Sequence, residues 1–232
     1  EREKVIEKTV SGEGIVSEII QKFNPEIEFT EIDLVSMLFY LGYLTINGEE
    51  VGYPLLKIPN NVMKEMYSDY FLRILKKKEN IDIYDNYTEI AKEIALEGKI
   101  NKIVDLLGEY LKNLSNRDYI KFDEKYVKLI FYCIAMNIKI YRVKSEIEIQ
   151  RKYPDILLIP RESNKEYKSV MIEFKYLKKE ENKKLKIVQE EARKQIKEYM
   201  NFEEIKNIRN IKCYTVVAVN DELYVEEIEN SW

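Results

Sequence analysis

The sequence predicts an α/β protein in which a mixed β-sheet with packed helices follows a mostly helical region. Three observations predict this class. Hydrophobic residues make up 45% of the 232-residue chain, which is enough for a sizeable core. The pair Asn47-Gly48, a strong β-hairpin signal, lies between two runs with helical spacing. After residue 118, extended apolar runs lie on both sides of one long, charged helical pattern.

Residues 1–80 are expected to form a winged-helix-like unit. Thr30 is expected to cap a helix whose apolar residues recur at helical spacing. Two extended runs then flank a polar turn, which is either Asn47-Gly48 or a longer turn that reaches Gly52. A helix over 61–78 completes the order helix, hairpin, helix.

Residues 81–117 are expected to form a helical connector. The runs 87–96 and 101–114 carry Ile, Ala and Leu at helical spacing and predict packing helices. The polar stretch 115–118 then marks the best candidate boundary, so that the second domain spans 118–232.

The second domain is expected to contain a helix, three strands, a long helix and two more strands. Antiparallel strands followed by a crossover helix favour a mixed sheet with helices packed on it. The expected elements lie at 123–138, 139–149, 155–159, 169–175, 180–200, 211–219 and 222–226.

The composition excludes several kinds of chemistry. The chain has no histidine, which excludes Ser-His-Asp and Cys-His catalysis, HExxH zinc sites and histidine-bound haem. A carboxylate-rich protein without histidine favours hard metal ions such as Mg²⁺. Cys133 and Cys213 lie in apolar surroundings and are expected to be buried thiols in a reducing compartment. No signal peptide or run of about 18 apolar residues is present, so a cytoplasmic location without a membrane partner is expected.

Two short motifs point to chemistry because of their position. Asp155, preceded by Pro154, opens an unbroken apolar run typical of a central strand. Glu173 and Lys175 end another apolar run, and strand alternation places both on one face. There the carboxylate can hold a metal while the lysine positions water or a phosphate. Glu-x-Lys also occurs elsewhere in this charged chain, for example at Glu97, so its place at the end of a strand singles out this copy.

A third motif lies on the following helix. Gln195 and Tyr199 are four residues apart and therefore share a helix face. Taken alone, the pair is more typical of the polar edge of an amphipathic helix.

Together, the three motifs resemble those of the PD-(D/E)xK nuclease superfamily, whose core is the restriction-endonuclease-like αβββαβ fold. The resemblance covers roughly residues 120–220, and the Gln-x-x-x-Tyr element is similar to that of RecB-like members. More narrowly, Gly42-Tyr43-Leu44-Thr45 and Ile58-Pro59-Asn60 resemble a bacterial branch in which the nuclease follows an AAA-ATPase-like domain. This implies that residues 1–80 are the tail of that domain, which is then a possible partner. The start at Glu1 favours a piece excised from a longer protein. The chain has no GxxxxGK[ST] motif, which predicts that this piece binds no ATP.

The resemblance implies metal-dependent hydrolysis of phosphodiester bonds in nucleic acid, with DNA as the expected substrate and Mg²⁺ or Mn²⁺ as the cofactor. Asp155 and Glu173 would bind the metal, and Lys175 would orient or activate the attacking water. Gln195 would support the site, and Tyr199 would support it or contact nucleic acid.

Four further residues complete the expected site. The superfamily's upstream acidic residue, on the first core helix, best matches Glu124, which would be a third metal ligand. Lys178, Lys179 and Lys183 crowd the loop and first turns after the expected catalytic strand. They are either a phosphate-binding rim or the solvated start of a helix in which lysines alternate with glutamates.

An alternative is a catalytically inactive module of the same fold that binds nucleic acid or protein and regulates an associated ATPase. Relatives often carry Gly-Arg-x-Asp before the metal aspartate, whereas this chain has Lys152-Tyr153-Pro154-Asp155. That departure and the net charge of −4 favour the alternative. A third reading makes the chain a structural appendage without affinity for nucleic acid.

Overall fold

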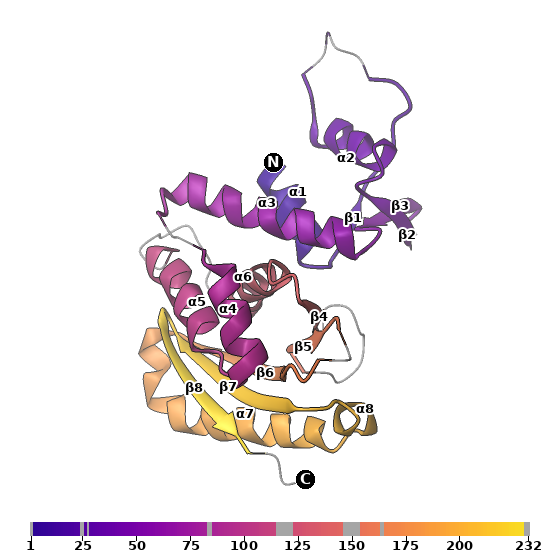
Figure 1. The fold of residues 1–232 in the computed structure, drawn as a ribbon. Helices are drawn as coiled ribbons and strands as arrows, with labels where there is room; N and C mark the ends of the chain where they lie inside the picture. The colour runs from indigo at the N-terminus through magenta and orange to yellow at the C-terminus, as the bar shows by residue number, and fades with distance from the viewer. Residues whose placement is uncertain are drawn as a thin grey trace. The chain divides into compact units, whose positions relative to one another are not determined.

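The computed structural model describes residues 2–23, 26, 28–82, 85–114, 123–145, 154–162 and 165–229. The chain folds into two compact units, residues 1–74 and 75–232 (Figure 1). The expected connector over 81–117 falls in the second unit, and its expected boundary at 115–118 lies outside the described residues.

The first unit combines helices with a small antiparallel sheet in the order β1-β3-β2. Thr30 caps helix α2 as predicted, because its hydroxyl accepts a hydrogen bond from the backbone N–H of Asp33 and the Asp33 carboxylate accepts one in return. The elements are α1 (Arg2–Val10), β1 (Ile15–Val16), α2 (Glu31–Tyr40), β2 (Thr45–Glu50), β3 (Tyr53–Lys57) and α3 (Asn61–Glu79), which extends into the second unit.

The hairpin turn of the first unit lies later than the pair Asn47-Gly48. Strand β2 continues through both residues, with an irregularity in the pairing between Ile46 and Glu49. The turn itself is Val51-Gly52, where φ is +51° and +83°. Those two residues supply the positive φ values of a tight hairpin turn. Both expected turns are therefore wrong: the turn does not lie at Asn47-Gly48, and it does not extend over the polar stretch up to Gly52, because residues 47–50 belong to β2.

The second unit is a five-stranded mixed sheet with helices on both faces. The strand order is β4-β5-β6-β7-β8, and only the pair β6–β7 is parallel. This confirms the predicted α/β class. The elements are α4 (Tyr87–Lys92), the π-helical turn η1 (Glu93–Glu97), α5 (Asn101–Leu114), α6 (Glu124–Met136), β4 (Tyr141–Ser145), β5 (Ile156–Pro160), β6 (Ser169–Leu177), the 3-10 helix η3 (Lys179–Lys184), α7 (Leu185–Met200), α8 (Glu203–Lys206), β7 (Ile211–Val219) and β8 (Glu222–Ile228).

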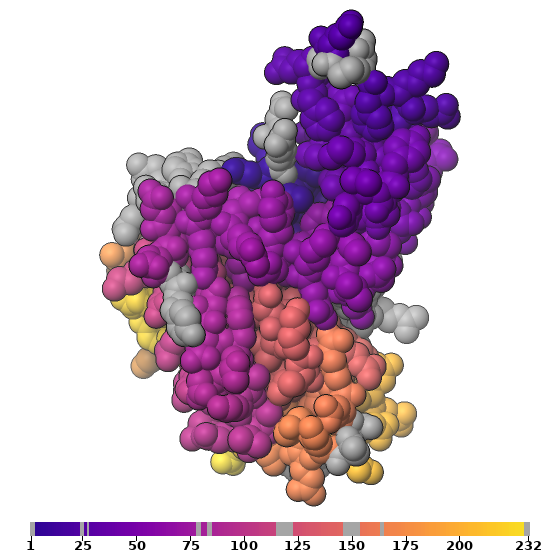
Figure 2. All heavy atoms as spheres, turned by 45° about the horizontal axis from the view of Figure 1, so that its top comes forward, coloured from indigo at the N-terminus to yellow at the C-terminus, as the bar shows by residue number. Residues whose placement is uncertain are grey.

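Helix α7 covers one face of this sheet, and α4, α5 and α6 lie on the other (Figure 1). On the α6 face, the rings of Phe131 and Phe174 meet edge to face at 4.8 Å between centroids. The backbone N–H of Lys168 donates to the carbonyl of Ala95 at 3.0 Å. This hydrogen bond joins η1 of the helical segment to the residue just before β6. Figure 2 shows side chains of this helical segment (magenta) beside those of the β4–β6 region (salmon to orange).

Two other expectations concern the state of the two cysteines and the presence of a membrane-spanning helix. Cys133 and Cys213 are buried and are not joined in a disulfide, as predicted. Among the described residues, no helix combines the length and the apolar character needed to cross a membrane.

Candidate active site

Strand β6 carries two charged residues on the face that packs against α7. Side chains alternate along a strand, so Glu173 and Lys175 share a face with Met171 and Leu177. Met171 and Leu177 belong to two separate apolar clusters, and α7 contributes to both of them. Glu173 and Lys175 therefore lie between these two apolar clusters.

Helix α7 packs apolar residues on the sheet face that carries this pair. Val188, Ala192 and Ile196 recur every four residues and share one helix face. Val188 packs in the cluster of Leu177, and Ile196 packs in the cluster of Met171. Ala192 is fully buried and lies between them along the helix.

Asp155 joins the pair from the neighbouring strand. Strands β5 and β6 are antiparallel with Ile156 opposite Ile172, and one further step along this register places Asp155 opposite Glu173. The backbone N–H of Phe174 donates to Asp155 Oδ2 at 2.8 Å. The Asp155 side chain is only 3% exposed. Strand pairing thus brings two buried carboxylates together.

Glu173 is only partly compensated. Lys175 Nζ lies 2.9 Å from Glu173 Oε1, whereas Oε2 is buried without a hydrogen-bond partner among the described residues. Burial and the nearby charge of Asp155 raise the pKa of Glu173 to about 7, although Lys175 and Lys128 act in the opposite direction. More positive charge at Oε2 would stabilise the ionised form.

Lys128 is the site residue that the sequence reasoning missed. Its Nζ lies 2.6 Å from Asp155 Oδ1 and 2.7 Å from Glu124 Oε1, so one ammonium group joins both carboxylates. Burial acts to lower the pKa of Lys128, but its contacts with Asp155 and Glu124 outweigh burial and leave it above the ordinary value. The only sequence signal was the i,i+4 spacing of Glu124 and Lys128, which also occurs in ordinary surface helices. Asp123, next to Glu124, is the N-cap of α6, and its side chain accepts from the N–H of Tyr126.

The two residues expected on α7 differ in their surroundings. Gln195 is half-buried, and its Oε1 has no hydrogen-bond partner among the described residues. Tyr199 is 9% exposed and packs in the apolar cluster of Met171 and Ile196. Its ring is therefore covered, which favours a supporting role over base stacking.

Lys178, Lys179 and Lys183 are all exposed after the end of β6. Asp155 precedes the first residue of the antiparallel neighbour β5, so the three lysines follow the same end of the sheet at which Asp155 lies. Acidic groups share this segment, because Glu181 forms an ion pair with Lys184 at 2.8 Å. The segment forms the 3-10 helix η3, whereas the sequence predicted the regular α-helix from about 180; the charged run before Leu185 lacks the apolar spacing that would dock a helix on the sheet.

The carboxylates fit a metal ion only in part. Among the described residues, no group of three or more Asp, Glu or Cys side chains is arranged to hold a metal. The expected set of Glu124, Asp155 and Glu173 is not assembled, because the Lys128 ammonium lies between the first two. Asp155 and Glu173 do offer hard oxygen ligands, and one of them, Glu173 Oε2, has no hydrogen-bond donor in the part of the chain that the structure describes. This pair therefore fits a divalent cation if Lys128 releases Asp155.

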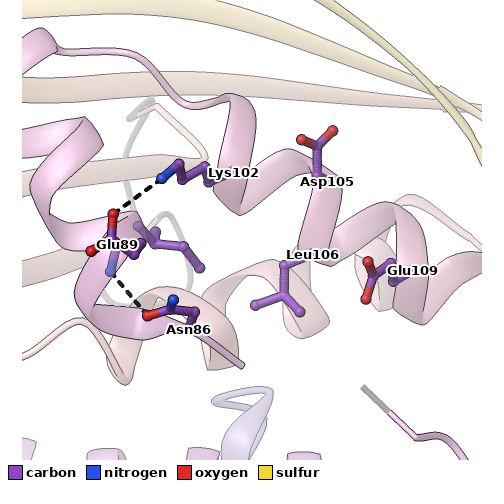
Figure 3. A pocket seen from close by; sticks show the side chains of 7 residues that line it. Asn86, Glu89, Lys102, Asp105, Leu106 and Glu109 are labelled. Carbon is purple, nitrogen blue, oxygen red and sulfur yellow. Dashed lines mark hydrogen bonds and ion pairs between the residues drawn. The ribbon is translucent and has the colours of Figure 1, made fainter. Parts of the chain in front are cut away.

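A pocket of about 240 Å³ lies away from these residues, on α4 and α5 (Figure 3). Some of its polar groups pair with one another: Asn86 accepts from the backbone N–H of Glu89, and the Glu89 carboxylate pairs with Lys102 at 3.3 Å. The pocket lacks the buried, unpartnered oxygen that distinguishes the β6 site, and it remains a surface feature of the helical layer.

One comparison with known proteins finds a family match in the second unit. Residues 122–228 match the family model of the PD-(D/E)XK nuclease superfamily, whose nucleases generally use divalent metal ions. The matched segment contains α6, the whole five-stranded sheet and α7. No curated protein matches the chain. Residues 122–228 of this chain thus belong to the PD-(D/E)XK nuclease superfamily, and they adopt its restriction-endonuclease-like fold.

Proposed function

We propose that the second unit is a metal-dependent nuclease that hydrolyses phosphodiester bonds, with DNA as its expected substrate. The observation that carries this proposal is the meeting of Asp155, Glu173 and Lys175 from neighbouring strands, with one buried carboxylate oxygen left without a donor among the described residues. A buried carboxylate oxygen without a hydrogen-bond donor lowers the stability of the folded protein, and such groups cluster at functional sites.

The roles of the residues follow from their surroundings. Asp155 and Glu173 would hold Mg²⁺ or Mn²⁺, which supplies charge stabilisation for the phosphorane-like transition state and a more acidic bound water. Lys175 is 17% exposed and keeps its ammonium beside Glu173, where it can orient a water molecule or a phosphate oxygen. Both side chains project from β6, two residues apart on one face of the strand.

Substrate would approach along the rim formed by Lys178, Lys179 and Lys183, which supplies positive charge near the carboxylates. Gln195 and Tyr199 would support the site from α7. The expected link to an AAA-ATPase-like domain and the cytoplasmic location stay predictions.

One observation favours an inactive binding module as a second candidate. Both oxygens of Asp155 are already engaged, by Lys128 and by the N–H of Phe174. A module of this kind would use the fold to bind nucleic acid or protein without cutting.

Cleavage assays separate the two candidates. The full chain is incubated with labelled single- and double-stranded DNA and with RNA, with Mg²⁺, with Mn²⁺ or with a chelator. The nuclease proposal predicts metal-dependent cutting that Asp155→Asn and Lys175→Met abolish while both variants still unfold cooperatively. The exposed ion pair of Lys212 with Glu227 provides the matched control, and Lys212→Met should cut like the wild type. Salt-sensitive binding without cutting, indifferent to metal, would select the binding module instead.

A further inference from the structure

Lys128 is the feature of the site that the proposed function does not use. Its side chain is 19% exposed. Its ammonium lies between Glu124, which was expected to be the third metal ligand, and Asp155, where a metal ion was expected. The two contacts are short, and the Asp155 side of the pair is almost completely buried. The Lys128 ammonium thus already compensates the negative charge of Asp155, the carboxylate that a divalent ion would need as a ligand.

The balance of charges in the site shows how the contact between Lys128 and Asp155 affects metal binding. With Glu173 ionised, three carboxylates face two ammonium groups, those of Lys128 and Lys175. Without Lys128 the same cluster would carry one more negative charge, and Asp155 Oδ1 would lose the partner that lies 2.6 Å away. The metal-free site would then be less stable and would attract a divalent cation more strongly.

Glu124 gives Lys128 a second partner. The two residues are one helical turn apart on α6, and their contact does not depend on Asp155. Lys128 can therefore release Asp155 and still keep an ion pair with the half-exposed carboxylate of Glu124.

On the basis of the proposed function, we propose that Lys128 is a built-in counter-cation of the metal site. It compensates Asp155 when no metal is bound and yields Asp155 to a divalent ion, remaining paired with Glu124. Lys128 is a positioning residue that sets the metal concentration at which the site fills, and Glu124 holds Lys128 and does not ligate the metal.

Metal binding to the full chain tests this proposal. Mn²⁺ is titrated into the wild type and into Lys128→Met by calorimetry, and the melting temperature is followed with and without Mn²⁺. Lys128→Met should melt lower without metal and bind Mn²⁺ about tenfold or more tightly, because a unit charge about 6 Å from a divalent ion changes its affinity about tenfold even at the dielectric constant of water. Lys128→Arg keeps the charge and should bind like the wild type. Lys212→Met, which removes an exposed ion pair, is the matched control. If Lys128→Met does not fold, Lys128→Gln replaces it.

A double-mutant cycle tests the role of Glu124. In the Lys128→Met background, Glu124→Gln removes one nearby negative charge and should weaken Mn²⁺ binding about tenfold or less. A much larger loss, as large as that caused by Asp155→Asn, would make Glu124 a metal ligand and would overturn that part of the proposal.

The outcomes separate this inference from the proposed function. If the wild type binds Mn²⁺ and cuts nucleic acid but Lys128→Met binds no more tightly, the counter-cation role is overturned and the nuclease proposal survives. If neither protein binds Mn²⁺ while both remain folded, both proposals are overturned. Tighter binding in Lys128→Met that Asp155→Asn abolishes supports the inference.

Discussion

The raised pKa of Glu173 makes the stability of the second unit depend on pH in a specific direction. The folded state holds the Glu173 proton more tightly than the unfolded state does. Its contribution to stability is therefore fully present below about pH 4.5 and is lost as the pH rises through about 7. A rise in pKa from 4.5 to about 7 corresponds to about 3 kcal/mol, and the 3% exposure of the side chain leaves little solvent screening.

Glu173→Gln removes this pH dependence of stability, because the glutamine amide carries no charge at any of these pH values. Its shape is similar to that of the protonated acid. The free energy of unfolding of the wild type, measured with urea by circular dichroism, should fall relative to Glu173→Gln by about 2–3 kcal/mol between pH 5 and pH 8. Glu191→Gln replaces an exposed carboxylate of α7 and should follow the wild type. Parallel profiles for the wild type and Glu173→Gln would refute the reasoning, because they would mean that the buried carboxylate is fully compensated.

Three further predictions follow from the same structure. Phe131→Ala removes the fully buried ring that meets Phe174 and should lower the free energy of unfolding by about 3–5 kcal/mol in denaturant melts. Replacing Lys178 and Lys183 by Gln should weaken nucleic-acid binding and reduce the salt dependence of the binding constant, with a slope smaller by about 1 for each phosphate that is no longer neutralised. An unchanged slope would remove these lysines from the interface. Thr30→Ala breaks the capping box of α2 and should cost about 1 kcal/mol, seen as faster amide hydrogen exchange in α2.

The sequence predicted the central strands of the second unit well because they are largely apolar runs. The runs beginning at Ile156, Ser169 and Ile211 became the three central strands, since buried strands need apolar side chains on both faces. The same patterns placed Asp155 and Glu173 at the ends of neighbouring apolar runs. Their opposition across the β5–β6 ladder depends on register, which no local pattern specifies.

Other features depend on contacts that are distant in the sequence. Lys128 gave no signal of its own, because its meeting with Asp155 joins a helix to a strand 27 residues later. Similarly, Asn47-Gly48 carries the usual turn residues, but the strand continues through them and turns at Val51-Gly52. In the hairpin, the pairing of β2 with β3 outweighed the local turn preference of Asn47-Gly48.

The most direct test of the site is a crystal structure of the full chain grown with Mn²⁺ and measured at the manganese absorption edge. The account predicts one anomalous peak within about 2.2 Å of carboxylate oxygens of both Asp155 and Glu173, with Lys128 moved off Asp155 and still paired with Glu124. A well-ordered site in which Lys128 remains on Asp155 and no peak touches Glu173 would contradict it.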